Sequence, residues 1–338
     1  MNFRPHKFWR GDILVAGSLA LVVGLWLQPA GAQQKTQDLD VLQLRPNFYM
    51  IAGAGGNIAL ETGPDGSVLV DAGTAEAADR VIAAIKTVTK YPIRYIINTS
   101  AEADHVSGNG KLSKFGQNMQ AAGPEPLGGE SARDLTNGYA ASIMSTDKLL
   151  LRMSAPTGKV ALFPEDDWPT ETYFAKRKTL SLNDDGIEIL NLPSHADGDS
   201  VVYFRRSDII VAGDVIDATS FPKLDLENGG TIGGEIVALN KIVELTIVPM
   251  PFVFKPGGTL VVTGHGRAYD QIDVLNYRDM VVTIRDIVFD MIKNGKTLEE
   301  IKAAQPAGPW AQQYGPKNSR YNADSFVETI YKSLKAGK

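Results

Sequence analysis

The sequence has 338 residues, a formal net charge of −5, 43% hydrophobic residues and no cysteine. The lack of cysteine excludes disulfide bonds and thiolate metal sites, so any bound metal must be held by nitrogen and oxygen ligands. A negative net charge without a cluster of Lys or Arg argues against nucleic acid as a partner.

The first 32 residues have the features of a secretory signal peptide. Basic residues at positions 4, 7 and 10 precede an uncharged apolar run over 13–27, and small residues follow at 30–32. The apolar run is short for a bilayer span, although an uncleaved membrane anchor is the alternative interpretation. We expect cleavage after Ala32, export to the periplasm or secretion, and no stable membrane span in the mature chain.

Alternating apolar and turn residues predict the elements of the first half. Apolar runs bounded by Gly and Asp indicate short strands over 48–51, 57–61 and 67–71. Thr74 is placed to cap a helix whose apolar face contains Val81, Ile82, Ile85 and Val88. A buried strand over 93–97 then leads into the polar loop 98–105. Polar loops at the carboxyl ends of strands are where open α/β sheets place their sites.

The second half resumes this pattern after an irregular stretch. Residues 117–180 predict an insertion that shapes or covers a pocket, or else an excursion remote from any site. Strands are then expected over 186–192, 200–205, 208–212 and 259–262, and helices over 232–247 and 270–293. Gly295 is a plausible end of the second of these helices, and Thr297 with Glu300 predicts a capping box. We expect one domain over 33–310, followed by a C-terminal segment, 311–338, with an amphipathic helix.

Three of the four histidines stand in loops that directly follow apolar runs. These are His105, His195 and His265, whereas His6 lies in the predicted signal peptide. Imidazole is a common metal ligand, and His265 lies between two glycines that leave room for close approach. The placement of these three histidines favours a metal site, although His195 could instead be a hydrogen-bonded loop residue.

Four fragments, in this order along the chain, resemble the metallo-β-lactamase superfamily. They are the Asn-Thr-Ser-Ala-Glu-Ala-Asp-His run over 98–105, His195 with Gly198 and Ser200, Gly213-Asp214, and Gly264-His265-Gly266. The resemblance covers roughly residues 41–290. It implies an α/β fold, a four-layer αβ/βα sandwich, with a metal site at one sheet edge.

The resemblance also implies a set of metal ligands. The family's second pocket is complete here, with Asp104, His105 and His265 as ligands and Asp214 as the carboxylate shared with the first pocket. The family's first pocket departs from the pattern, because Ser100 and Glu102 replace its first two histidines. The first pocket therefore retains Glu102, His195 and part of Asp214.

Two further residues have implied supporting roles. Asp71, at the end of a predicted strand, resembles the family's aspartate that orients ligands beneath the signature loop. Ser100 is interpreted as a passive replacement beside the ligands, and Asp104 could orient a water molecule as well as bind metal. Lys223 could bind an anionic substrate or could be a solvated surface lysine.

The chemistry of these ligands predicts zinc, as one or two ions. A catalytic zinc needs three protein ligands, which the second pocket supplies unaided. Glu102 shifts the first pocket toward oxygen, which makes iron or manganese the alternative.

The resemblance implies an exported, metal-dependent hydrolase that uses a metal-activated hydroxide. The expected substrates are esters, lactams, lactones or phosphoesters. Two alternatives remain open. One is a non-catalytic or binding descendant of the fold whose first pocket is degenerate, and the other is a di-iron redox site.

Overall fold

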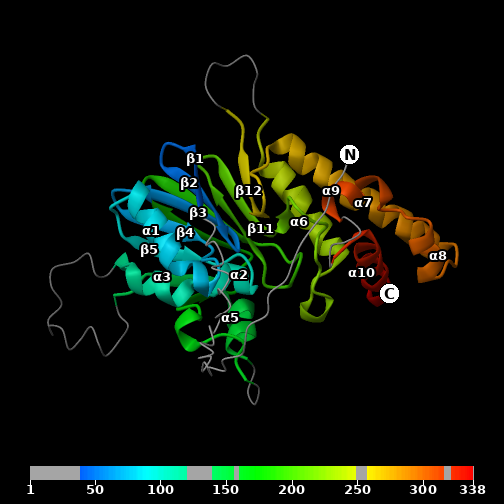
Figure 1. The fold of residues 1–338 in the computed structure, drawn as a ribbon, viewed down its shortest axis with the longest axis horizontal. Helices are drawn as coiled ribbons and strands as arrows, with labels where there is room; N and C mark the ends of the chain where they lie inside the picture. Colours follow the sequence, from blue (N-terminus) through cyan, green and yellow to red (C-terminus); the bar gives the residue numbers. More distant parts are fainter. Residues whose placement is uncertain (1–38, 120–138, 156–159, 249–256, 316–320, 338) are drawn as a thin grey trace, which may run out of the picture. The chain divides into compact units, whose positions relative to one another are not determined.

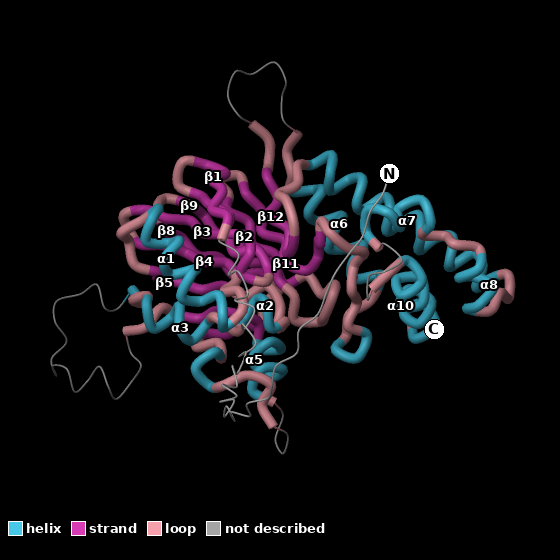
Figure 2. Tube along the Cα trace, viewed as in Figure 1, coloured by secondary structure: helices cyan, strands magenta, loops and turns pink. Residues whose placement is uncertain are grey.

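The computed structural model describes residues 39–119, 139–155, 160–248, 257–315 and 321–337 (Figure 1). The predicted signal peptide, 1–32, lies outside these residues. The described strands form two sheets, which pack against one another and overlap in the view of Figure 2. The first sheet has the order β1-β2-β3-β4-β5-β6-β7 and the second has the order β12-β11-β10-β9-β8.

The strands of the first sheet are β1 (Asp40–Arg45), β2 (Phe48–Ala54), β3 (Gly56–Gly63), β4 (Gly66–Val70), β5 (Ile93–Ile97), β6 (Ser142–Thr146) and β7 (Glu171–Tyr173). The strands of the second are β8 (Arg177–Leu182), β9 (Asp185–Asn191), β10 (Ser200–Phe204), β11 (Ile209–Asp217) and β12 (Leu260–His265). The first four strands pair as an antiparallel meander, whereas β4 to β7 pair in parallel. In the second sheet only β11 and β12 are parallel.

Helices provide the crossovers that parallel pairing requires. The α-helices are α1 (Ala78–Val88), α2 (Ala103–Val106), α3 (Asn109–Phe115), α5 (Asp147–Ser154), α6 (Ile232–Leu245), α7 (Gln271–Lys293), α8 (Leu298–Ala303), α9 (Ala311–Tyr314) and α10 (Ala323–Ala336). Short 3-10 turns are η1 (Ala75–Ala77), η3 (Glu165–Asp167), η4 (Leu226–Asn228) and η5 (Gly308–Trp310). Helix α1 connects β4 to β5, and α6 connects β11 to β12.

Three apolar clusters define four layers. Leu69 of β4 packs with Val81 and Ile85 of α1 on the helix side of the first sheet. Val68 and Val70 point to the opposite face, where they join side chains of the second sheet. A third cluster joins the second sheet to α6, α7 and α10. Because successive strand residues alternate between faces, each sheet supplies two clusters. This arrangement confirms the predicted αβ/βα sandwich.

Predictions from local sequence signals were confirmed at two helix ends. Thr297 and Glu300 form the predicted capping box, and Gly295 has a φ of 77° just after α7. The prediction that Thr74 caps a helix was only partly correct. Thr74 precedes the 3-10 turn η1, and its side chain makes no capping hydrogen bond. The tight turn between Thr74 and α1 takes the place of the expected cap.

The prediction that residues 117–180 form an irregular insertion was wrong for part of this stretch. Strands β6 and β7 add to the first sheet, and β8 forms an edge of the second. Strand β7 has only three residues and β6 only five, so neither is long enough to show a clear alternation of apolar and polar residues. Residues 120–138 and 156–159 of the predicted insertion lie outside the described residues, and the proposed domain boundaries stay a prediction.

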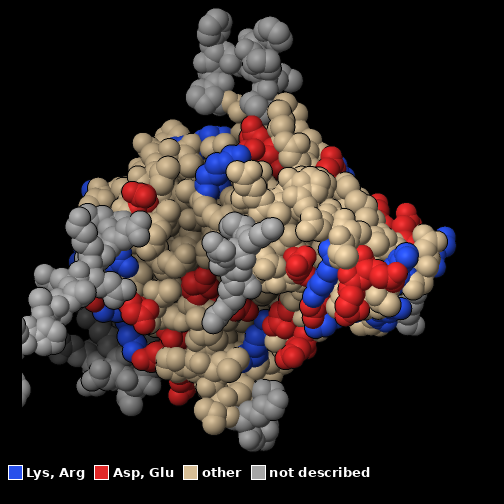
Figure 3. All heavy atoms as spheres, turned by 45° about the vertical axis from the view of Figure 1, so that its right-hand side comes forward, with Lys and Arg blue, Asp and Glu red and all other residues tan. Residues whose placement is uncertain are grey.

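Charged side chains are interspersed on the face seen in Figure 3. Between α8 and α10, the Lys302 ammonium contacts a Glu328 carboxylate oxygen at 2.5 Å, and Lys332 contacts the other oxygen at 2.7 Å. Such surface ion pairs contribute about 1 kcal/mol or less each. Among the described helices, none has both the length and the apolar character needed to cross a membrane.

One carboxylate of β3 lies in the core. The Glu61 side chain is fully buried, and neither of its oxygens has a hydrogen-bond partner among the described residues. Burial, with the neighbouring charge of Asp185, raises the pKa of Glu61 to about 8. Glu61 therefore stabilises the fold best when it is protonated.

We predict that Glu61→Gln removes a pH dependence of stability. Because the folded pKa is raised, the contribution of Glu61 is fully present below about 4.5 and is lost as the pH rises toward 8. Between pH 5 and 8, the unfolding free energy of the variant should gain on the order of 3 kcal/mol relative to the wild type. Urea unfolding at both pH values measures this, with the exposed Glu76→Gln as the control for the amide. A constant difference across this range would contradict the prediction.

Candidate metal centre

The polar residues predicted to bind metal meet at one edge of the two sheets. Asp71 directly follows β4, and the loop that ends in His105 follows β5. Asp214 lies near the end of β11, and His265 is the last residue of β12. Because β4 pairs with β5 in parallel and β11 with β12 in parallel, the carboxyl ends of these strands share one edge. His195 joins them from the loop between β9 and β10.

The second pocket brings four predicted ligands together. One ligand atom each from Asp104, His105 and His265 lies within 4.8 Å of the others. The Asp104 Oδ2 atom is 3.2 Å from His265 Nε2. The Asp214 Oδ1 atom is 3.1 Å from His105 Nε2 and 3.8 Å from His265 Nε2. Two imidazoles and two carboxylates form a nitrogen and oxygen donor set that suits zinc, iron or manganese.

Opposite charges stabilise one another in this pocket. The hydrogen bond to His265 holds the pKa of Asp104 below its usual value, and the same contact raises the pKa of His265. Burial opposes a positive charge on His105, but the carboxylates of Asp214 and Asp71 raise its pKa well above the usual value. Burial likewise opposes the charge of Asp214, but His105 and the other histidines lower its pKa. A metal ion must therefore displace protons from these imidazoles when it binds.

Asp71 holds the His105 ring from behind. Its Oδ2 atom is 2.7 Å from His105 Nδ1, so Nε2 points toward Asp214. The same carboxylate accepts hydrogen bonds from the Thr99 amide at 2.8 Å and the Thr99 hydroxyl at 2.6 Å. Asp71 has a φ of 65°, a conformation that short Asp and Asn side chains tolerate better than most. This arrangement is the one expected of a residue that orients a ligand.

The first pocket offers fewer metal-ligand atoms than the second. The Glu102 Oε1 atom is 3.2 Å from His195 Nε2, and His195 Nδ1 contacts the carbonyl of Lys223. The Ser100 hydroxyl donates to Asp214 Oδ2 at 3.3 Å and accepts from the Glu102 amide at 3.2 Å. All the predicted site residues thus lie at the same edge. That Glu102 and His195 are metal ligands stays a prediction.

A cavity of about 110 Å³ opens onto both pockets. It is lined by Glu102, Asp104, His195, Asp214, Asp217, Lys223 and His265. The Lys223 ammonium faces Asp217 Oδ2 at 3.6 Å and is half exposed. The cavity therefore combines five of the six predicted metal ligands with one cation that an anionic substrate could contact.

Three acidic residues near the site were missed from the sequence. Asp217 accepts from the amides of Thr219 and Ser220, and an Asp followed by Thr and Ser is a turn signal that could have indicated it. Asp199 and Glu235 are both buried behind His195. Burial raises the pKa of Asp199 to about 7 and that of Glu235 well above its usual value. No local signal marks these two, because their burial depends on packing between distant segments.

The loop that carries His195 rests against the start of α6. A methyl group added at Gly234 would lie 2.4 Å from the carbonyl oxygen of Pro193, whereas one added at Gly233 would meet nothing within 4 Å. Residue 234 must therefore be glycine, because any larger side chain would collide with the loop.

We predict opposite effects of alanine at these two neighbouring positions. Gly234→Ala should destabilise the fold by about 2 kcal/mol and lower activity, because the clash with backbone displaces the His195 loop. Gly233→Ala should stabilise it by about 0.5–1 kcal/mol, since alanine favours the helix. Thermal unfolding and steady-state kinetics of both variants measure this. Equal stabilities would show that the loop is not held in this way.

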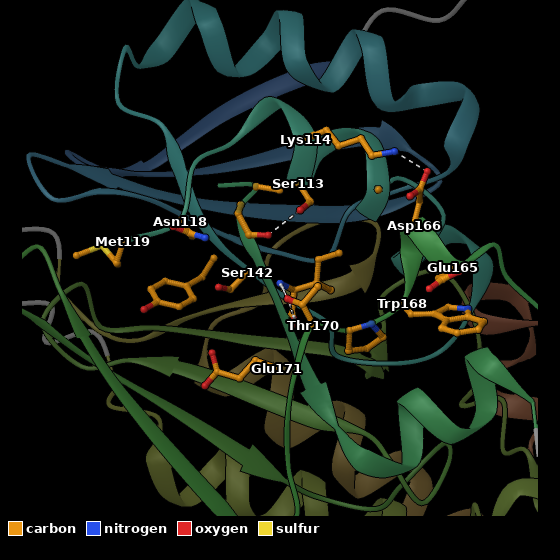
Figure 4. Close-up of a pocket in the computed structure, with 16 residues that line it drawn as sticks. Ser113, Lys114, Asn118, Met119, Ser142, Glu165, Asp166, Trp168, Thr170 and Glu171 are labelled. Carbon is orange, nitrogen blue, oxygen red and sulfur yellow. Dashed lines mark hydrogen bonds and ion pairs between the residues drawn. The ribbon is translucent and has the colours of Figure 1, made fainter. Parts of the chain in front are cut away.

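A separate cavity of about 710 Å³ is lined by residues of α3, η3, β6 and β7 and the loops beside them (Figure 4). Lys114 and Asp166 point toward one another at its rim, with 2.5 Å between the ammonium and the carboxylate oxygen. Ser142, Thr170 and Glu171 line its interior. It shares no residue with the predicted metal ligands, and its lining contains no histidine. We therefore place the candidate site in the smaller cavity.

Comparison with known proteins adds a family match. A sequence profile described as the metallo-beta-lactamase superfamily matches residues 52–277. The chain is 21% identical over 280 residues to the linear primary-alkylsulfatase of Pseudomonas sp. (strain ATCC 19151), which covers 76% of this chain and 51% of that protein.

Two solved structures show the same fold. The sec-alkylsulfatase Pisa1 from Pseudomonas sp. is 12% identical with a TM-score of 0.54, covering 87% of this chain and 50% of that one. The DIM-1 metallo-beta-lactamase is 13% identical with a TM-score of 0.51, covering 73% of this chain and 98% of that one. The chain thus spans about half the length of the alkylsulfatases that it matches.

Proposed function

The chain belongs to the metallo-beta-lactamase superfamily, and from this membership we propose that it is a metal-dependent hydrolase of a small-molecule substrate. The observation that carries the proposal is the convergence of Asp104, His105 and His265, whose ligand atoms lie within 4.8 Å of one another. Asp214 faces two of these residues from β11. Asp104, Asp214 and His265 line a cavity, with His105 buried beside them, and these two imidazoles and two carboxylates are suited to hold a catalytic cation.

Each residue of the site has its own proposed role. Asp104, His105, Asp214 and His265 would hold the cation, which lowers the pKa of a water molecule and stabilises negative charge on a reacting oxygen. Asp71 keeps the His105 ring in one orientation through its contact with Nδ1. Asp104 lines the cavity, so its carboxylate also orients the attacking water.

The size and charge of the cavity favour a small reacting group with an anionic part. A volume of about 110 Å³ admits a functional group but not a whole larger molecule, for which cavities of about 300 Å³ or more are typical. Lys223 supplies a cation for the anionic part. Esters, lactams, lactones and phosphoesters are candidate substrates. The likeness to the linear primary-alkylsulfatase adds sulfate esters to these candidates.

Zinc is the proposed metal, as one or two ions, with iron or manganese as the alternative. The mixed nitrogen and oxygen donor set supports zinc at the second pocket, and Glu102 supports a harder cation at the first. We also propose export to the periplasm or secretion, for which the basic and apolar pattern of residues 4–27 is the support.

Hydrolysis of a substrate panel tests the proposal. The purified chain, loaded in turn with Zn²⁺, Mn²⁺ and Fe²⁺, is expected to hydrolyse at least one chromogenic carboxylic ester, lactam, lactone, phosphoester or sulfate ester. A chelator should abolish the activity, and the metal should restore it. A chain that binds none of these metals, or that binds metal and hydrolyses nothing in the panel, would contradict the proposal and favour a non-catalytic role.

A further inference from the structure

The two pockets differ in how many metal ligands they can offer. In the second, a ligand atom from each of three residues lies within 4.8 Å of the others, and Asp214 Oδ1 faces both imidazoles. Within the described residues, no other group of at least three His, Asp or Glu side chains meets this spacing. In the first pocket only Glu102 and His195 are in direct contact, because Asp214 directs Oδ1 at the imidazoles of the second pocket while its Oδ2 accepts from Ser100. A catalytic zinc ordinarily has three protein ligands, so the second pocket meets this requirement and the first does not.

Ser100 does not supply the missing third metal ligand of the first pocket. The Ser100 hydroxyl donates to Asp214 Oδ2 at 3.3 Å and accepts from the Glu102 amide at 3.2 Å. A neutral hydroxyl is a weak ligand for zinc. In this position Ser100 holds the loop together and positions the Asp214 carboxylate.

The pair formed by Glu102 and His195 nevertheless faces the reaction space. Both residues line the cavity of about 110 Å³ together with Asp104, Asp214 and His265. The Glu102 side chain is 44% exposed, whereas that of His195 is only 10% exposed. His195 is fixed from behind by the carbonyl of Lys223, which its Nδ1 atom contacts. Glu102 is therefore the member that can touch substrate or water, and His195 is the member that holds it.

We propose that this chain binds a single metal ion, in the second pocket, and that the pair of Glu102 and His195 stays free of metal and faces the substrate where the family's first ion would lie. His195 is a positioning residue that orients Glu102 through the 3.2 Å contact between Nε2 and Oε1. This inference rests on the proposed hydrolase function and specifies how its site works.

Metal stoichiometry gives the first test, independent of activity. Metal-free chain is titrated with Zn²⁺, and the dialysed protein is then measured by elemental analysis. The wild type is expected to hold one equivalent of zinc. The Ser100→His/Glu102→His double variant, which supplies two more imidazoles beside His195, is expected to hold two. Two equivalents in the wild type would overturn the inference.

Single variants give the second test. Glu102→Gln and His195→Asn are each expected to keep one equivalent of zinc, because neither side chain holds the ion. The matched control is Glu171→Gln, a glutamate that lines the separate cavity, and it should match the wild type. Loss of zinc from Glu102→Gln or from His195→Asn would overturn the inference.

These outcomes separate the inference from the proposed function. A wild type that hydrolyses an ester while holding two equivalents of zinc would leave the hydrolase function standing and remove the single-ion site. A wild type that holds no zinc and hydrolyses nothing would remove both. If Glu102→Gln fails to fold, the zinc content of the wild type and of the double variant still decides the matter.

Discussion

Asp104→Asn is expected to abolish tight zinc binding and to lower kcat/KM by about 1,000-fold, because it removes a charged ligand and several kcal/mol of charge stabilisation. Asp104 Oδ2 is 3.2 Å from His265 Nε2, and the hydrogen bond between them lowers the pKa of Asp104. An amide in its place is a weaker ligand and cannot balance the imidazoles. Elemental analysis after dialysis and steady-state kinetics with the best panel substrate measure the two effects.

A matched control for this variant lies at the separate cavity. Asp166→Asn makes the same chemical change at an exposed carboxylate that contacts Lys114 at 2.5 Å. Its zinc content should equal that of the wild type, and its kcat/KM should lie within about 2-fold, since surface ion pairs contribute little. An Asp104→Asn chain with wild-type zinc content would show that the second pocket is not the metal site.

Asp71→Asn is expected to destabilise the metal-free fold by about 2–3 kcal/mol, because a buried carboxylate that accepts three hydrogen bonds becomes an amide. The Asp71 side chain is only 1% exposed and contacts the Thr99 amide, the Thr99 hydroxyl and His105 Nδ1. Zinc affinity should also fall by about 10- to 100-fold, as is usual when the partner of a ligating imidazole is lost. Urea unfolding with a chelator present, and zinc titration, measure the two quantities.

The choice of asparagine separates charge from backbone strain. Asp71 has a φ of 65°, which Asn adopts nearly as readily as Asp and which alanine adopts with difficulty. Asp71→Ala should therefore be less stable than Asp71→Asn by an additional amount of about 1 kcal/mol. If Asp71→Asn matched the wild type in both stability and zinc affinity, Asp71 would have no role in holding His105.

The sequence predicted the parts of the fold that depend on local patterns. The apolar run Ile93–Ile97 became β5, and the polar loop after it carries Glu102, Asp104 and His105 to the candidate site. The short strands β6 and β7 were missed, because β6 is fixed by pairing with β5, and β7 by pairing with β6. Parallel pairing joins segments far apart in the chain, which periodicity within a short window cannot reveal.

The candidate site was likewise predicted where it depends on motifs in the sequence and missed where it depends on contacts between distant segments. The order of motifs brought His105, His195 and His265 into consideration, and the structure places all three at one sheet edge. The contact between Glu102 and His195 crosses 93 residues of sequence and depends on how the loop of His195 rests on α6. The burial of Glu61 within β3 also had no signal, because a charged residue in a strand ordinarily faces solvent.

Anomalous X-ray diffraction from crystals grown with Zn²⁺, collected at the zinc absorption edge, tests the central claim most directly. We predict one strong peak per chain, within bonding distance of Asp104, His105, Asp214 and His265. The absence of a peak among these four side chains, with zinc bound elsewhere or not at all, would contradict the metal centre and the hydrolase function that depends on it.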